Sequence, residues 1–228
     1  MSQPYAGLTP DTVIDCIEQI GYRCDLRLLV LNSYENRVYQ VGIEDETPVI
    51  AKFYREGRWT DTQILEEHEF ALELESHGLS VVAPLVVNGA TLHHAMGHRF
   101  SVFPRRGGHP PELDNLDHLL SLGRTLARIH RVGATLTLPH RPTLSIDRTV
   151  TQSREFVLEH FVPRDLVPAY SSLAQDCEQA IRGLLSTHDD SMNQIIHGDC
   201  HTGNILWRDD TPHFVDLDDC YSAPIIQD

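Results

Sequence analysis

The stretch IIHGDCHTGNILW, residues 195–207, places a polar loop between two short apolar runs. Within that loop Asp199 supplies a carboxylate and, five residues later, Asn204 supplies an amide oxygen. The stretch FVDLDD, residues 214–219, then brings a further carboxylate, Asp216, to the end of another short apolar run. The intervening DDT has the composition of a hairpin turn, so we expect Asn204 and Asp216 to lie close together.

These side chains fit the chemistry of phosphoryl transfer from a nucleotide. That reaction needs a base or positioning group for the acceptor hydroxyl, oxygen ligands for Mg²⁺, and a cation on the phosphates. Mg²⁺ is usually held by one or two protein carboxylates together with waters and phosphate oxygens. Asp199, Asn204 and Asp216 are therefore the candidate chemical centre of the chain.

The composition is that of an ordinary globular protein with an acidic balance. The chain has 228 residues, of which 41% are hydrophobic and 22% charged, and its net charge is −15. This length suffices for one large domain or two closely packed lobes. The charge argues against duplex nucleic acid or an anionic membrane as a partner, although a bound divalent cation would still allow an anionic ligand.

Targeting patterns and cysteine spacing indicate the compartment. No apolar run of the sequence reaches the roughly 18 residues of a membrane helix, and the N-terminus lacks the pattern of a secretory signal. The five cysteines are an odd number without a disulfide spacing, so we interpret them as reduced thiols. We expect a cytoplasmic, monomeric protein with no nucleic-acid or membrane partner. The apolar pair Ile225-Ile226 indicates the start of a buried element, so we expect the fold to continue beyond Asp228.

The first half of the chain is predicted to form strands with inserted helices. Capping signals and terminal glycines predict helices over residues 10–21 and 60–78. Residues 80–87 are predicted to form an edge strand or a bend, because Pro84 interrupts an apolar run there. Apolar or alternating runs predict further strands at residues 27–31, 36–43, 48–54 and 99–103.

Beyond residues 105–111, the stretch RRGGHPP, the pattern turns helical. Apolar residues recur at helical spacing from Leu116 to His130, and we expect His130 on the core face as a hydrogen-bonded structural residue. The pattern then predicts helices at 147–160 and 165–188 and short strands at 194–196, 204–208 and 213–217. The prediction is an α+β fold with a β-rich N-lobe (1–104), a linker (105–112) and a mainly helical C-lobe (113–228).

The second predicted helix suggests a buried ion pair. Glu67 lies on its otherwise apolar face, whereas Glu66 and Glu69 point elsewhere and residues 66–75 are mostly a solvated face. A buried carboxylate is unfavourable unless it is paired. Lys52 lies on an apolar strand and has the same need, so we predict that Lys52 and Glu67 pair.

The chain contains the motif HGDxxxxN, residues 197–204, and the later triplet FVD, residues 214–216. This combination resembles the aminoglycoside phosphotransferase and choline kinase family of the protein-kinase-like fold. The stretches LNSYENRVYQ, AKFYREGRWT and ILEEHEFALEL extend the resemblance over nearly the whole chain. They narrow it to a bacterial subfamily of serine/threonine protein kinases of the stress response. The resemblance implies a two-lobed protein-kinase-like fold, ATP and Mg²⁺ as cofactors, and a serine or threonine hydroxyl of a protein as acceptor.

The resemblance also implies roles in the polar loop and the acidic stretch after it. Asp199 becomes the catalytic base. Asn204 and Asp216 become the Mg²⁺ ligands, and Asp216 counts with the catalytic residues. For the two carboxylates that follow, Asp218 and Asp219, we expect that at least one is structural rather than chemical.

Further roles implied by the resemblance lie in the N-lobe. Lys52 matches the strand lysine that contacts the nucleotide phosphates, and Glu67 matches its glutamate partner. The segment at Phe103 would receive the adenine edge. Ser33 falls in the turn that takes the place of a glycine-rich loop; because this turn contains no glycine, phosphate contact would rest on Ser33 and backbone N–H groups.

Other interpretations of the same residues remain open. The polar loop could be a turn with local hydrogen bonds, and Lys52 could be a surface lysine with only its stem packed. His197 fits an orienting role better than that of a base. His197, Cys200, His201 and Cys220 could form a zinc site, although their spacing is unusual for structural zinc. Cys200 could be redox-sensitive, or a small filler beside the base.

Three functions follow from this set of interpretations. The preferred one is an ATP- and Mg²⁺-dependent protein serine/threonine kinase. The second is a kinase for a small hydroxyl acceptor, of the aminoglycoside, choline or homoserine type. The third is a non-catalytic nucleotide-binding regulator, against which the filled base, amide and carboxylate positions argue.

Overall fold

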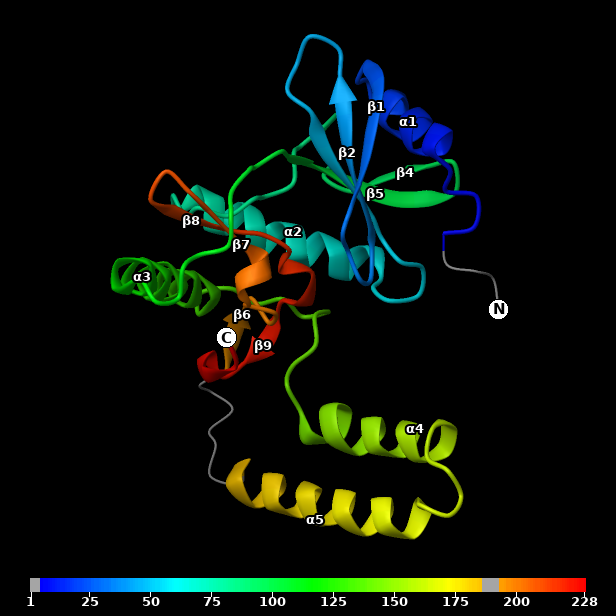
Figure 1. The fold of residues 1–228 in the computed structure, drawn as a ribbon, viewed down its shortest axis with the longest axis vertical. Helices are drawn as coiled ribbons and strands as arrows, with labels where there is room; N and C mark the ends of the chain where they lie inside the picture. The colour runs from blue at the N-terminus through cyan, green and yellow to red at the C-terminus, as the bar shows by residue number, and fades with distance from the viewer. Residues whose placement is uncertain (1–4, 186–192) are drawn as a thin grey trace.

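The computed structural model describes residues 5–185 and 193–228 and shows a sheet-bearing N-lobe followed by a mainly helical C-lobe (Figure 1). The first four residues of the chain and residues 186–188, the end of one predicted helix, lie outside the described residues. None of the helices in the described part of the chain combines the length and apolar character that a bilayer span requires.

The N-lobe is built on an antiparallel sheet with the strand order β1-β2-β3-β5-β4. Its strands are β1 Cys24–Leu31, β2 Arg37–Ile43, β3 Val49–Phe53, β4 His93–Ala95 and β5 His98–Pro104. Lys52 lies on the central strand β3, between Val38 of β2 and Ser101 of β5. Residues 80–87 bend rather than add a strand, because Val81 bridges to Phe214 of the C-lobe.

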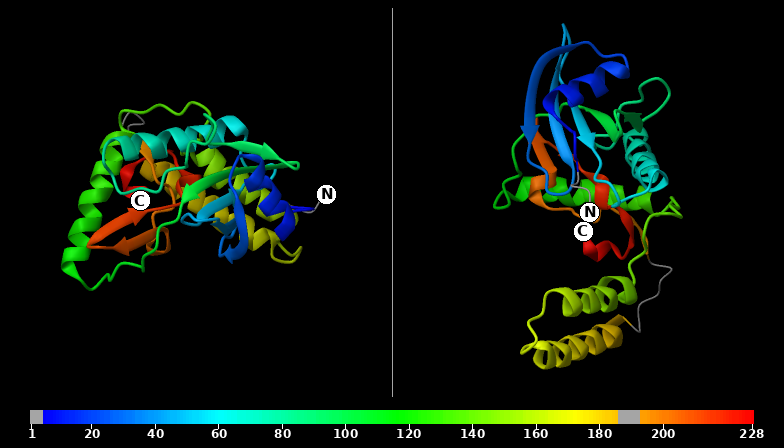
Figure 2. Two further views of the ribbon diagram at one scale, coloured as in Figure 1. Left: turned by 90° about the horizontal axis from the view of Figure 1, so that it is seen from above. Right: turned by 90° about the vertical axis from the view of Figure 1, so that its right-hand side faces the viewer.

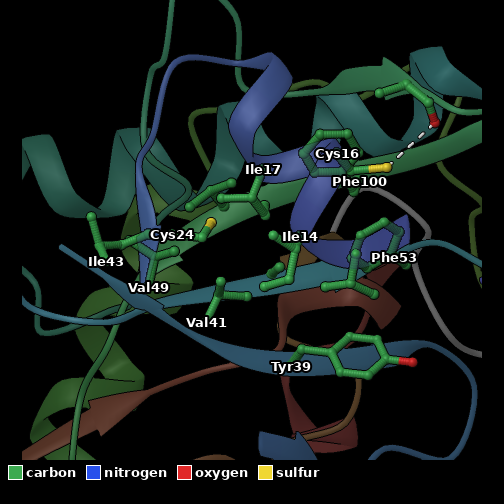
Figure 3. Close-up of a cluster of buried hydrophobic side chains, with 14 residues drawn as sticks. Ile14, Cys16, Ile17, Cys24, Tyr39, Val41, Ile43, Val49, Phe53 and Phe100 are labelled. Carbon is green, nitrogen blue, oxygen red and sulfur yellow. Dashed lines mark hydrogen bonds between the residues drawn. The ribbon is translucent and has the colours of Figure 1, made fainter. Parts of the chain in front are cut away.

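Helix α1, Pro10–Gln19, covers one face of this sheet (Figure 1). It starts at the predicted cap, where the Thr9 side chain accepts a hydrogen bond from the backbone N–H of Thr12. Its buried side chains meet those of the strands in one apolar cluster, in which Ile14 and Ile17 lie over Val41 and neighbouring residues (Figure 3). This cluster makes the sheet a rigid support for Lys52.

Helix α2, Asp61–Ser76, connects the two lobes. A capping box starts it, since the Thr60 hydroxyl and the Gln63 side chain each accept the other's backbone N–H. Its buried residues Phe70, Ala71 and Leu74 belong to a second apolar cluster that is shared with the C-lobe. The position of α2 is therefore set by both lobes.

The C-lobe is centred on α3, Leu116–Gly133, and two small antiparallel pairs of strands. β6 Gln194–Ile196 pairs with β9 Tyr221–Ala223, and β7 Ile205–Arg208 pairs with β8 Thr211–Phe214. α3 packs so closely on β6 that a Cβ at Gly133 would lie 1.9 Å from the carbonyl oxygen of Ile195. The helices predicted at 147–160 and 165–188 appear as a π-helical turn, Asp147–Thr151, followed by α4 Gln152–His160 and α5 Val167–Leu185. α4 and α5 form a hairpin apart from the rest of the lobe (Figure 2).

Two apolar segments differ from expectation. Leu116, Leu119 and Leu120 are exposed, because the buried residues of α3 lie in its C-terminal part, which packs on β6. His130 in that part is buried and bonded to Asp228, as predicted. Ile225 and Ile226, expected to start a buried element, are exposed in a short 3₁₀ turn, Ile225–Gln227, in the described part of the chain. The limits of the lobes at 1–104, 105–112 and 113–228 stay a prediction.

Candidate active site

A cavity of about 320 Å³ lies between the N-lobe sheet and the polar loop of the C-lobe. Its apolar walls come from both lobes and include Val38, Ile50, Ala71, Val82, Phe103, Leu206 and Val215. Every predicted site residue except Asp199 lines it: Ser33, Lys52, Glu67, Phe103, Asn204 and Asp216. A larger cavity of about 450 Å³ at the end of α1 contains none of these residues. The first cavity is therefore the candidate site.

Lys52 forms the charged floor of the cavity. Its Nζ lies 3.2 Å from Glu67 Oε1, 2.9 Å from Asp216 Oδ1 and 3.2 Å from Asp218 Oδ1. Burial alone would lower the pKa of Lys52, but the three carboxylates outweigh it and raise that pKa well above its ordinary value. Lys52 is the only lysine of the chain, and it is buried, so the surface-lysine interpretation is wrong. The ion pair with Glu67 expected from the sequence is present.

The pKa values of the two buried carboxylates around Lys52, Glu67 and Asp218, are shifted in opposite directions. Burial raises the pKa of Glu67 to about 7, although Lys52 opposes this effect. Burial also acts to raise the pKa of Asp218, but Lys52 and Arg58 together lower it to about 2. Arg58 Nη1 lies 2.9 Å from Asp218 Oδ2, to which the Asn36 amide also donates at 3.2 Å. Asp218 is thus a structural carboxylate that connects both lobes.

The loop that carries Asp199 is held in place by the buried side chains of Asp228 and His130. The backbone N–H groups of His197 and Gly198 donate to the carboxylate of Asp228 at 2.9 and 2.8 Å, and His130 Nε2 lies 2.9 Å from the same carboxylate. Gly198 has φ +84°, and a Cβ there would lie 2.2 Å from Asp219 O, so only glycine fits. These contacts set the loop firmly against α3.

His197 orients this loop. Its Nε2 donates to the carbonyl oxygen of Val215 at 3.0 Å, while its Nδ1 accepts the backbone N–H of Asp199 at 3.3 Å. Burial lowers the pKa of His197, which favours the neutral ring that can make both bonds. The ring thus connects the loop before Asp199 to the strand end before Asp216.

Asn204 and Asp216 face the same cavity from adjacent strand ends. The Asn204 amide Nδ2 donates to Asp199 O at 3.0 Å and to Asp199 Oδ2 at 3.1 Å, so its Oδ1 points away from Asp199. The Val215 N–H donates to Asn204 O at 3.0 Å, which brings the two segments together. Asp216 has φ 60° and ψ 63°, a left-handed conformation that is uncommon for a residue other than glycine.

This donor set suits a magnesium ion better than zinc. Within the described residues no group of three or more histidine, cysteine, aspartate or glutamate side chains is arranged to hold a metal. The zinc interpretation is therefore wrong for this structure, and Cys220 instead accepts a hydrogen bond from buried Arg141. One carboxylate and one amide oxygen beside a cavity, from Asp216 and Asn204, is a set that Mg²⁺ accepts when phosphate oxygens and waters complete it.

Cys200 supports the simpler of its two interpretations. It is partly buried, and burial raises its pKa to about 12, which disfavours the thiolate that oxidation requires.

Sequence patterns did not reveal several groups at the site. Glu66, expected on a solvated face, is buried against residues 140–141, and the roles of Arg58, Arg141 and Asp228 gave no local signal.

The chain is similar to known kinases. A model described as the phosphotransferase enzyme family matches residues 28–228. Stress response kinase A of Escherichia coli K12 is 43% identical over 225 residues, which are 98% of this chain and 68% of that protein. A protein named serine/threonine protein kinase RdoA, from Salmonella typhimurium LT2, is 40% identical over 98% of this chain and 68% of its own length. The chain thus spans about two thirds of these relatives.

Solved structures share the fold at lower identity. The structure of amicoumacin kinase hAmiN in complex with AMP-PNP, Ca²⁺ and Ami has a TM-score of 0.79 at 20% identity and covers 95% of this chain and 66% of its own. A microcompartment-associated aminopropanol kinase has a TM-score of 0.72 at 19% identity and covers 92% of this chain and 70% of its own. The two-lobed kinase fold predicted from the sequence is confirmed.

Proposed function

The chain belongs to the phosphotransferase enzyme family, and from that premise we propose that it transfers the γ-phosphate of ATP, with Mg²⁺, to serine or threonine hydroxyls of proteins. The observation that carries the proposal is the cavity in which Lys52, Asp216 and Asn204 meet below apolar walls. The name of the relative from Salmonella typhimurium LT2, a serine/threonine protein kinase that is 40% identical, supports the protein acceptor.

The residues of the chain would divide the work as follows. The apolar walls, with Phe103 near the end of β5, would hold the adenine ring of the nucleotide. Ser33 and the backbone beside it would lie near the phosphates. Lys52 presents its ammonium to the phosphates, and Glu67 keeps it in place. Asn204 and Asp216 would hold Mg²⁺, which neutralises charge on the phosphates when bound.

Asp199 is the proposed base. Its side chain is half exposed and accepts a hydrogen bond from Asn204, which lines the cavity, so an acceptor hydroxyl can approach it from solvent. A carboxylate within hydrogen-bond reach of the hydroxyl takes its proton as the oxygen attacks the γ-phosphorus. The hydrogen bond from the Asn204 side-chain amide occupies Asp199 Oδ2, so the other carboxylate oxygen is left to accept that proton.

A small hydroxyl acceptor is the second candidate. The structural neighbours named for an amicoumacin and an aminopropanol substrate share the fold with this chain, although their identities support the fold alone. A non-catalytic regulator is the third, and the filled positions at Asp199, Asn204 and Asp216 argue against it.

One experiment separates these candidates. The full chain is incubated with γ-labelled ATP and Mg²⁺, once with a mixed protein extract and once with a panel of amino alcohols. Label on protein bands supports the proposal, label on a small amine supports the second candidate, and binding of ATP without any transfer supports the third. Asp199→Ala should lower the rate of labelling by roughly 10²–10⁴-fold, and Asp176→Ala, which changes an exposed aspartate of α5, should not change it. Labelling by Asp199→Ala at the wild-type rate would contradict the assigned base.

A further inference from the structure

The neighbour of Glu67 on α2 performs a different task. Glu66 is only 7% exposed and does not line the nucleotide cavity. Its carboxylate accepts the backbone N–H of His140 at 3.1 Å, His140 Nδ1 at 2.7 Å and the backbone N–H of Arg141 at 2.7 Å. One turn earlier, the amide of Gln63 donates to His140 O at 2.8 Å. α2 therefore holds residues 140–141 of the C-lobe on two sides.

Arg141 extends this connection to the acidic segment. It is 4% exposed, and its guanidinium lies 4.3 Å from the ring centre of Trp59. Its Nε donates to Cys220 O at 2.9 Å, and its Nη2 donates to Asp218 O and to Cys220 Sγ. A planar guanidinium with several fixed donors is suited to hold a backbone segment in one position, which a lysine cannot do.

These contacts close a ring of interactions around the site. From α2 the ring runs through Glu66 to Arg141, and from Arg141 to the backbone of Asp218. The Asp218 carboxylate then contacts Lys52, and Lys52 returns to α2 through Glu67. Two adjacent residues of α2 thus fix the positions of different groups. Glu67 holds Lys52, and Glu66 holds, through Arg141, the segment that follows Asp216.

We propose that Glu66 and Arg141 are positioning residues for phosphoryl transfer, because they fix the Asp216–Cys220 segment relative to Lys52. This inference rests on the proposed function. Neither residue lines the cavity, so both act through the groups that they hold. Misplacement of a reacting group by about 1 Å can lower a rate by roughly 100-fold, so small shifts of this segment matter.

The experiment uses Glu66→Gln and Arg141→Lys in the full chain. The matched controls are Glu69→Gln, at an exposed position of α2, and Arg124→Lys, at an exposed position of α3. The first measurement, amide hydrogen exchange at residues 217–220 without nucleotide, does not depend on activity. The second measures kcat and the KM for ATP. We expect faster exchange in both test variants, a fall in kcat of about 10- to 100-fold, and a KM within about threefold of wild type.

The two readouts separate the proposals. If the wild-type chain transfers no phosphate, the proposed function fails, and exchange at residues 217–220 still decides the inference. Exchange equal to wild type in both variants overturns the inference, and so does an unchanged kcat in correctly folded variants. If both variants fail to fold, Glu66→Asp decides, because it keeps the charge but draws the carboxylate back from the N–H groups of His140 and Arg141. Faster exchange in that variant supports the inference, and wild-type exchange overturns it.

Discussion

The candidate site has a buried half and an exposed half. In the buried half, the side chains of Lys52, Glu67 and Asp218 are at most 7% exposed, and Lys52 forms an ion pair with each of the two carboxylates. In the exposed half, the carboxylates of Asp199 and Asp216 are 50% and 47% exposed. The groups that position others are thus buried and held by ion pairs, whereas the groups that would meet substrate and metal keep oxygens open to solvent.

The sharpest test of this difference is Asp199→Ala in the exposed half. Loss of the proposed base should lower kcat by roughly 10²–10⁴-fold, while nucleotide affinity and the free energy of unfolding stay nearly unchanged. The reason is that Asp199 is half exposed and that Asn204 keeps its bond to the backbone oxygen of residue 199. Steady-state kinetics, nucleotide titration and urea unfolding measure the three quantities. A variant that unfolds as easily as a core mutant would erase the distinction between the halves.

In the buried half, Lys52→Met should affect stability as well as turnover. Its removal leaves Glu67 and Asp218 buried with one cation fewer, and breaking a buried ion pair from one side typically costs about 3–5 kcal/mol. Urea unfolding of the chain, followed by the fluorescence of Trp59 and Trp207, measures this loss. Lys52→Met/Glu67→Gln should lose less than the sum of the single changes, because the pair is coupled. Additive losses would show that the pair is not an energetic unit.

Asp216→Ala tests the residue of the exposed half that also contacts the buried half. Its carboxylate contacts Lys52 on the buried side and is half exposed toward the cavity. We expect Mg²⁺-dependent nucleotide affinity to fall at least tenfold, whereas affinity measured without Mg²⁺ changes little, because the apolar walls are intact. Calorimetric titration with and without Mg²⁺ provides the comparison. Equal losses under both conditions would remove Asp216 from the metal site.

Both halves contain residues that the sequence predicts, whereas the residues that support them are not predicted. The loop from His197 to Asn204 and the pair Lys52–Glu67 were predictable, because a motif and one helix face carry their signals locally. Arg141 and Asp228 were not, because each acts through partners far away in the chain. The backbone of Arg141 meets Glu66 at a separation of 75 residues, and nothing near either residue marks the contact.

The exposed face of α3 was mispredicted for a related physical reason. Helical spacing of Leu116, Leu119 and Leu120 shows that they share a face, but spacing does not say which part of a helix meets the core. In the structure the contact is made at the other end, where Gly133 allows β6 to approach. Asp218 agrees with the expectation that at least one of Asp218 and Asp219 is structural, since it is buried where Lys52 and Arg58 contact it from the N-lobe.

Asp228 supports the loop that carries Asp199, and we expect Asp228→Asn to have a smaller effect on stability and turnover than the changes above. Its carboxylate accepts the N–H groups of His197 and Gly198 and lies 2.9 Å from His130 Nε2. The amide can accept fewer of these bonds, and a buried donor left without a partner costs about 1–3 kcal/mol. We expect a lower free energy of unfolding together with a fall in kcat, because the loop that carries Asp199 loosens. Asp176→Asn, at an exposed site of α5, is the control. A fall in stability with unchanged kcat would limit Asp228 to a structural role.

The smallest predicted effect is a pH dependence within the buried half. Glu67 has its pKa raised from 4.5 to about 7 by burial, against the opposing charge of Lys52, so the folded chain binds this proton more tightly than the unfolded chain. Its contribution to stability is therefore complete below about pH 4.5 and is lost as the pH rises to about 7. Asp218 has its pKa lowered from 3.8 to about 2, so its opposite contribution changes only below this window.

Glu67→Gln isolates this contribution, because glutamine is neutral at every pH. We expect the free energy of unfolding of the variant, relative to wild type, to rise between pH 4.5 and 7, with a slope that cannot exceed about 1.4 kcal/mol per pH unit. Urea unfolding at several pH values measures the difference, and Glu69→Gln on the exposed side of α2 should give a flat line. A difference that stays nearly flat over this window would mean that the charge of Lys52 outweighs burial. Glu67 would then be ionised across the whole window, and the two carboxylates of the buried half would respond alike.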